Sequence, residues 1–200
     1  MLQYGKLLGG LDIMKKTLIE FPHEFTTNRL RIRLPLPGDG QVVQQAIEYS
    51  QADLKPWLAF AKEVPTKEFM EANIREAHAE FLLREDLRLH IFHKESGEFI
   101  GSTGLHRINW DARCFEIGYW IDSRHSGKGY MMEAVEGLTN FAFNELKANR
   151  VEIRCDSKNI RSKRIPEKLG FVLEGILRNN SLAIHGEGLR DTCVFAKVRN

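Results

Sequence analysis

The stretch FEIGYWIDSRHSGKGYMM, residues 115–132, decides the fold of this chain. A strand-like apolar pattern over 114–121 runs into a segment with two glycines, Gly127 and Gly129, and then into a long helical pattern. We predict a helix over 127–146 with both glycines in its first turn. Glycine inside a helix costs about 0.5–1 kcal/mol relative to alanine. Their presence therefore indicates that another group must approach the backbone at this junction.

Hydrophobic periodicity outlines the rest of the chain as an α+β fold. The expected strands cover 29–35, 88–94, 99–108, 114–121, 150–155 and the late segments GFVLEGIL and LRDTCVFAKV. The expected helices follow the PGDG turn at 37–40, begin after the capping residue Thr66, and cover 127–146 and 160–168. The strand at 150–155 is reached through a helix, so it should run parallel to its predecessor. We therefore expect a mixed, mostly antiparallel central sheet flanked by helices.

Composition bounds the function. The 200 residues include 42% hydrophobic and 28% charged positions, which fits one soluble globular domain after a poorly specified leader, residues 1–25. The net charge of +2 does not argue for nucleic acid or a membrane surface, and no apolar run reaches 18 residues. Three dispersed cysteines without a CxxC pair predict no disulfide framework and favour the cytoplasm. The histidines lack metal-ligand spacing, so we expect no metal.

The glycine segment itself is typical of an anion site. The first turn of a helix presents unpaired N–H groups, and glycine lets a bulky group come close. Arg124 and Lys128 add positive charge. A Walker loop is excluded because Gly129 follows Lys128, and a dinucleotide fingerprint is excluded because Met132 stands at its third glycine position. The alternative is a turn whose glycines only permit tight helix–strand packing.

Four motifs in order extend this interpretation: EIGYWI at 116–121, RHSGKG at 124–129, NIRS at 159–162 and EKLGFVLEG at 167–175. With them the chain resembles the GNAT family of acetyl-CoA-dependent N-acetyltransferases, over roughly residues 26–199. The RimJ/RimL-like branch, which acetylates the N-termini of ribosomal proteins, is the most similar. The resemblance implies an acyl-CoA N-acyltransferase fold in which two parallel strands splay apart and acetyl-CoA lies in the gap.

The resemblance also assigns cofactor contacts. The backbone around Tyr119, Trp120 and Ile121 would pair with the pantetheine amides, and Asn159 would contact the pantetheine arm. The pyrophosphate would be held by the backbone N–H groups of Ser126, Gly127, Lys128, Gly129 and Tyr130, with Arg124 beside it. Ser162 would lie near the thioester sulfur and help to protonate the leaving thiolate. The alternative for Asn159 and Ser162 is helix capping alone. Pro166, inside the same helix, would clash with a carbonyl one turn back unless the first turn is distorted.

The reaction needs a neutral amine. An α-amino group has a pKa of about 7.7–8.0 against about 10.4 for lysine, so a weak base suffices for an N-terminal amine. Glu116 is the first candidate for that base, because related enzymes use a glutamate there; His106 on the preceding strand is the second. The chain departs from the ribosomal-protein enzymes at Ser181, where they carry a glutamate. Either Glu116 serves, or Glu187 or His185 replaces it, or the substrate differs.

Three functions are compatible with these residues. The first is acetyl transfer to the N-terminal α-amine of a protein such as a ribosomal protein. The second is acetylation of a small amine, although the mixed apolar segment 50–65 suits a peptide better than a polycation. The third is a catalytically silent acyl-CoA-binding module. Direct transfer is expected, with Cys155 a buried structural residue rather than an acetylated intermediate. Relatives include monomers and homodimers, so both states stay open.

Overall fold

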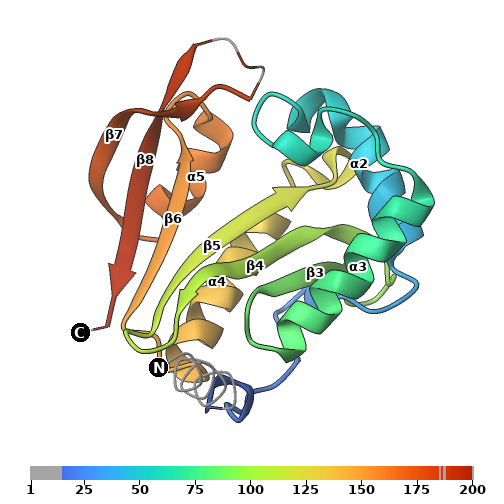
Figure 1. Cartoon of the computed structure of the whole chain (residues 1–200), viewed down its shortest axis with the longest axis horizontal. Helices are drawn as coiled ribbons and strands as arrows, with labels where there is room; N and C mark the ends of the chain where they lie inside the picture. Colours follow the sequence, from blue (N-terminus) through green and yellow to red (C-terminus); the bar gives the residue numbers. More distant parts are fainter. Residues whose placement is uncertain (1–14, 185, 187, 200) are drawn as a thin grey trace, which may run out of the picture.

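One eight-stranded sheet organises the protein in the computed structural model, which describes residues 15–184, 186 and 188–199 (Figure 1). Its strands are β1 Glu24–Thr26, β2 Leu30–Arg33, β3 Leu87–His93, β4 Phe99–Asn109, β5 Cys114–Ile121, β6 Arg150–Asp156, β7 Val172–Leu182 and β8 Leu189–Val198. They lie in the order β1-β2-β3-β4-β5-β6-β8-β7. Among the strands of the described residues, only the β5–β6 pair is parallel. The predicted mixed, mostly antiparallel sheet is confirmed.

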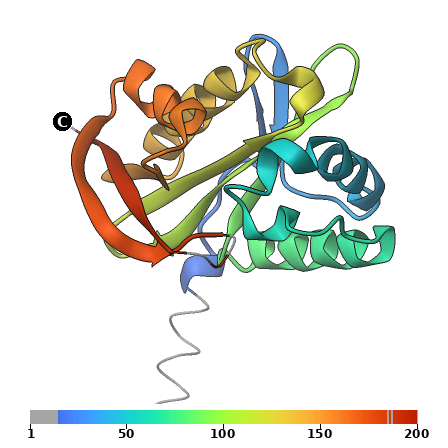
Figure 2. The same ribbon diagram turned by 90° about the horizontal axis from the view of Figure 1, so that it is seen from above.

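Helices cover both faces of this sheet (Figure 2). On one face lie α2 Gly40–Leu54 and α3 Lys67–Leu82, and on the other α4 Tyr130–Asn144 and α5 Ile160–Lys168; two 3-10 turns, η1 Ala59–Ala61 and η2 Ser123–His125, complete the elements. α3 begins where Thr66 Oγ1 accepts a hydrogen bond from Phe69 N at 3.1 Å, as the capping signal predicts. Among the described residues, no helix is long and apolar enough to cross a membrane.

The core lies mainly between the sheet and α4. The apolar stripe predicted for this helix, Met131, Val135, Leu138 and Ala142, is buried against residues of the central strands. The sequence interpretation missed β1, which pairs with β2, and Phe21 and Phe25 pack against the same core. The end of the segment expected to be a leader is therefore part of the domain.

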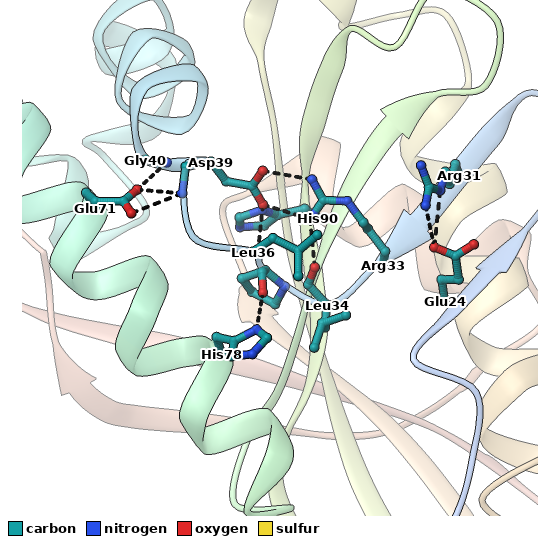
Figure 3. Close-up of polar contacts among 12 residues, drawn as sticks. Glu24, Arg31, Arg33, Leu34, Leu36, Asp39, Gly40, Glu71, His78 and His90 are labelled. Atoms are coloured by element: carbon teal, nitrogen blue, oxygen red, sulfur yellow. Dashed lines mark hydrogen bonds and ion pairs between the residues drawn. The ribbon is translucent and has the colours of Figure 1, made fainter.

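A buried ion cluster fixes the chain between β2 and α2 (Figure 3). Asp39 receives both terminal nitrogens of Arg33, at 2.8 and 2.7 Å, and its Oδ2 lies 2.9 Å from Nδ1 of His90. Burial by itself would raise the pKa of Asp39, but hydrogen bonds from Arg33, His90 and the Leu36 N–H hold it well below its usual range. Burial lowers the pKa of His90, so this ring is a neutral donor. The cluster anchors the entry to α2 on the sheet.

Helix α3 holds the same entry from the other side (Figure 3). Glu71 accepts the N–H groups of Gly38, at 3.0 and 3.1 Å, and of Gly40, at 3.2 Å, and His78 Nδ1 lies 2.7 Å from the Pro35 carbonyl oxygen. A Cβ at Gly40 would lie 2.6 Å from the Cα of Glu71, so only glycine fits there. Helix α2 is thereby positioned along the edge of the site described next.

Candidate active site

The strands β5 and β6 pair where they begin and then diverge (Figure 1). Their parallel pairing covers only Cys114 to Glu116 against Arg150 to Glu152, and the rest of each strand leaves the other. Gly118 and Trp120 turn their carbonyl oxygens toward β4, where Gly118 O accepts Thr103 Oγ1 at 2.9 Å and Trp120 O lies against Gly101. Backbone groups alternate along a strand, so those of Tyr119 and Ile121 face the gap. The gap thus offers an unpaired strand edge.

The segment after β5 ends in two glycines with left-handed backbone, Gly127 at φ +77° and Gly129 at φ +80°. Helix α4 begins at Tyr130, with Gly129 as its N-cap, so the prediction that the glycines lie within the first turn is wrong by three residues. Glycine is needed because a side chain at positive φ is strained. A Cβ at Gly127 would meet nothing within 4 Å, so the space in front of it is open.

This loop presents a run of free backbone donors. Within the described residues, the N–H groups of 127–132 make no hydrogen bond. The N–H of Ser126 is different, because it donates to Ser123 O at 3.2 Å and closes η2. The donors sit at the N-terminus of α4, where the helix dipole also favours negative charge. Such an arrangement of donors can bind an anion.

Arg29, which the sequence interpretation placed only as a strand residue, supports the loop from behind. Its Nη1 donates to Lys128 O at 3.1 Å, its Nε donates to Glu133 Oε2 at 2.7 Å, and its guanidinium lies 4.5 Å from the Tyr130 ring centroid. Arg124, expected beside the anion, donates to both oxygens of the fully buried Asp122 and lies 5.1 Å from the Tyr49 ring centroid. No local sequence pattern predicts this role for Arg29, because Arg29 and Lys128 are 99 residues apart in the sequence.

Across the gap, β5 is tied to α5 through Tyr119. The side chain of Asn159 caps α5, accepting a hydrogen bond from Ser162 N at 3.0 Å. Ser162 O has no helical donor, because the residue four positions on is Pro166. The Tyr119 hydroxyl donates to this oxygen at 2.9 Å and accepts Ser162 Oγ at 3.2 Å. Burial raises the pKa of Tyr119 far above its usual range, so it is a neutral donor.

The cysteine near this link is not activated. Cys155 lies at the end of β6 and is 9% exposed. Burial raises its pKa to about 11, so the thiol is neutral near pH 7. This agrees with the expectation of direct transfer rather than a covalent intermediate on Cys155.

The two candidate bases lie on the other face of the sheet, the one covered by α2 and α3. Glu116 on β5 and His106 on β4 are directly opposed in the strand register. Burial raises the pKa of Glu116, although Arg107 at 3.1 Å and Arg154 at 3.6 Å both oppose that rise. Trp120 shares this face and lies 5.9 Å, between ring centroids, from Phe60 of the segment 50–65.

The remaining candidates fall in or beside the β7–β8 connection. Ser181 ends up in β7, where its Oγ accepts Arg190 Nε at 2.7 Å. His185 and Glu187, the proposed replacements for the missing glutamate, lie outside the described residues. Among the described residues, no group of histidine, cysteine or carboxylate side chains is arranged to hold a metal.

Comparison with known proteins agrees with this geometry. The acetyltransferase (GNAT) domain family matches residues 29–172. A Bacillus subtilis protein named as a ribosomal N-acetyltransferase, YdaF, is 31% identical over 75% of this chain and 81% of its own length. The ribosomal-protein-serine acetyltransferase of Escherichia coli is 32% identical over 50% of this chain and 55% of its own.

Solved structures share the fold. A probable acetyltransferase superposes with a TM-score of 0.80 at 27% identity, covering 88% of this chain and 97% of its own. RimL, described as a ribosomal L7/L12 α-N-protein acetyltransferase in complex with coenzyme A, superposes with a TM-score of 0.79 at 19% identity, covering 86% of this chain and 95% of its own.

Proposed function

The chain belongs to the acetyltransferase (GNAT) family, and from this premise we propose that it acetylates the N-terminal α-amine of a protein. Acetyl-CoA-dependent acyl transfer follows from the family itself. The protein acceptor is supported by relatives named for ribosomal proteins. It is supported further by the aromatic and apolar residues at the open end of β5, including Trp120 and Phe60.

Acetyl-CoA fits the gap between β5 and β6. The unpaired backbone of Tyr119 and Ile121 suits the pantetheine amides, which would add to the strand edge. The free N–H groups of 127–132 suit the diphosphate, and the open space at Gly127 is the room that it needs. This cradle of main-chain donors is the single observation that carries the cofactor assignment. The bound cofactor supplies the thioester; the chain's own residues orient it and handle protons.

Ser162 and the base candidates divide the proton chemistry between two faces of the sheet. The Ser162 hydroxyl lies on the α5 side and donates to the Tyr119 hydroxyl at 3.2 Å; by rotating, it can donate to a leaving thiolate instead. Glu116 and His106 lie on the α2 side, where they can take a proton from an incoming amine. The amine nitrogen attacks the thioester carbon, the C–S bond breaks, and the amine proton passes to the base, which later releases it to water. The leaving thiolate is stabilised by a hydrogen bond from Ser162 and takes its proton from solvent. The products are an amide and free CoA.

The charges near Glu116 favour a peptide over a polyamine. Besides Arg107 and Arg154, Arg150 lies on this side, paired with Glu152 at 2.8 Å. Guanidinium groups compensate the carboxylates, so the surface lacks the unpaired negative charge that a polycation needs. An N-terminal amine carries at most one charge and loses it near neutral pH.

One assay separates the candidate functions. The protein is incubated with labelled acetyl-CoA and with panels of free N-terminal peptides, N-blocked lysine peptides and small amines. We expect turnover with free α-amines. Turnover confined to small amines would replace the proposal with the second function. Tight CoA binding without turnover on any acceptor would indicate the acyl-CoA-binding module.

A further inference from the structure

The ring of His106 lies in a slot made by two glycines. A Cβ at Gly104 would lie 2.9 Å from its Cε1, and a Cβ at Gly118 would lie 2.9 Å from Cδ2 and 3.1 Å from Nε2. The 2.9 Å distances are shorter than real Cβ contacts, so a side chain at Gly118 would displace the ring, and one at Gly104 would meet both the ring and the β3 backbone at Leu87 and Arg88. The two strands thus leave out side chains where the imidazole lies against the sheet. The ring is therefore held in place by steric contacts with the sheet.

Asp86, immediately before β3, fixes the remaining freedom of the ring. Its Oδ2 lies 2.6 Å from His106 Nδ1, while its Oδ1 is buried and has no hydrogen-bond partner. An ionised carboxylate only accepts, so Nδ1 carries the hydrogen and Nε2 keeps its lone pair in the neutral ring. The ring is the only hydrogen-bond partner of Asp86 among the described side chains, and the carboxylate stabilises the ring once it is protonated.

The free nitrogen faces the site. Nε2 lies over Gly118, two residues beyond Glu116, where the pairing of β5 with β6 ends. It has no partner among the described residues. Glu116, by contrast, already accepts Arg107 Nη1 at 3.1 Å and lies 3.6 Å from Arg154 Nε. Both guanidinium groups lie at Oε2 of Glu116 and favour its ionised form, whereas Nε2 of His106 has no such competitor and the ring has a carboxylate behind it.

We propose that Asp86 is a positioning residue that holds His106 so that Nε2 receives the proton of the acceptor amine. The inference rests on the proposed function and deepens it, because it selects His106 over Glu116 as the base. As the nitrogen attacks the thioester carbon, its N–H bond breaks and the proton moves to Nε2. The C–S bond electrons leave with the thiolate. Bulk water later takes the proton from the imidazolium.

Charged groups surround His106 from several elements. Asp86 lies behind the ring, Glu116 faces it from β5 and Arg107 follows it on β4. Arg154 of β6 lies beyond Glu116, and Arg88 of β3 is held by Asn73 at 2.7 Å. Of these groups, only Asp86 is hydrogen-bonded to the ring. Removing its carboxylate charge should therefore affect the His106 ring more directly than changing any of the others.

The test compares Asp86→Asn with the conservative Asp86→Glu and with a control, Glu85→Gln. Within the described part of the chain, the exposed carboxylate of Glu85 forms an ion pair only with Lys16, at 3.5 Å. A general base contributes typically about 10²–10⁴-fold. We expect Asp86→Asn to lower kcat about 10- to 100-fold with an unchanged KM for acetyl-CoA. Asp86→Glu should restore most of kcat, and Glu85→Gln should change neither.

A double-mutant cycle with His106→Gln tests whether Asp86 acts through the ring. Adding Asp86→Asn to His106→Gln should cause no further loss of kcat. Multiplicative losses, or an unchanged kcat in Asp86→Asn, would each overturn the proposal.

A readout without turnover keeps this inference separate from the acceptor assignment. Nitrogen-15 NMR of the wild-type imidazole should show the hydrogen on Nδ1, and Asp86→Asn should lose that preference. A wild-type ring with its hydrogen on Nε2 would overturn the proposal. Failure of every peptide acceptor in an enzyme that keeps the Nδ1–H ring would overturn the proposed function instead.

Discussion

Replacing Gly127 by alanine should separate the cofactor role of the glycine loop from its backbone strain. At φ +77° an alanine costs about 1–2 kcal/mol in a left-handed conformation. Nothing lies within 4 Å of the new Cβ, so no packing clash adds to that strain. The methyl group would instead occupy the open space proposed for the diphosphate. Displacing one charge-assisted hydrogen bond costs about 1.5–3 kcal/mol, which weakens binding about 10- to 100-fold.

Gly170→Ala is the matched control. Gly170 follows α5, has φ +72°, and also has nothing within 4 Å of a built Cβ. The two variants should therefore lose similar free energy of unfolding, as measured by urea denaturation. Calorimetric titration with acetyl-CoA should show the weaker binding only for Gly127→Ala. Wild-type affinity in a folded Gly127→Ala protein, or an equal loss of affinity in Gly170→Ala, would refute the reasoning.

Three further variants test the other parts of the account. Asp39→Asn leaves Arg33 with a buried uncompensated charge and should cost about 3–5 kcal/mol of unfolding free energy, whereas Glu24→Gln, which breaks an exposed pair, should cost about 0–1 kcal/mol; similar losses would contradict the role of the cluster. The pKa of Asp39 is held below its unfolded value of about 3.9, so its contribution to wild-type stability should be full above that pH and should decline as the pH falls below it. The free energy of unfolding should therefore fall more steeply with acid in the wild type than in Asp39→Asn. Equal slopes in acid denaturation would contradict this prediction. Tyr119→Phe leaves the Ser162 carbonyl oxygen without a hydrogen-bond donor and should lower the free energy of unfolding by about 1–3 kcal/mol, as measured by urea denaturation. An unchanged midpoint would mean that water satisfies that oxygen.

Local sequence patterns were sufficient to predict the helices and strands that bury one continuous row of apolar side chains. The spacing of Met131, Val135, Leu138 and Ala142 predicts α4, and the helical connection before β6 predicts its parallel pairing with β5. β1 escaped because its three residues are too short to show an alternation. The start of α4 was predicted three residues too early because the sequence alone does not show that Gly127 and Gly129 have positive φ angles.

The site was predictable only where a motif is contiguous. The glycine loop, Asn159 and Ser162 could be proposed because each belongs to a short pattern. Arg29 and Asp86 could not, since each acts on a segment far away along the chain: Arg29 on Lys128, and Asp86 on His106. Such pairs depend on strand register, which one sequence does not specify. Pro166 did signal an irregular helix, but not that Tyr119 would take the released carbonyl.

The most direct test of the central claim is a crystal structure of the wild-type protein with bound CoA. The account predicts diphosphate oxygens at about 2.7–3.2 Å from backbone nitrogens within 127–132, with the pantetheine arm between β5 and β6. A diphosphate bound elsewhere, with those N–H groups facing only solvent, would contradict it.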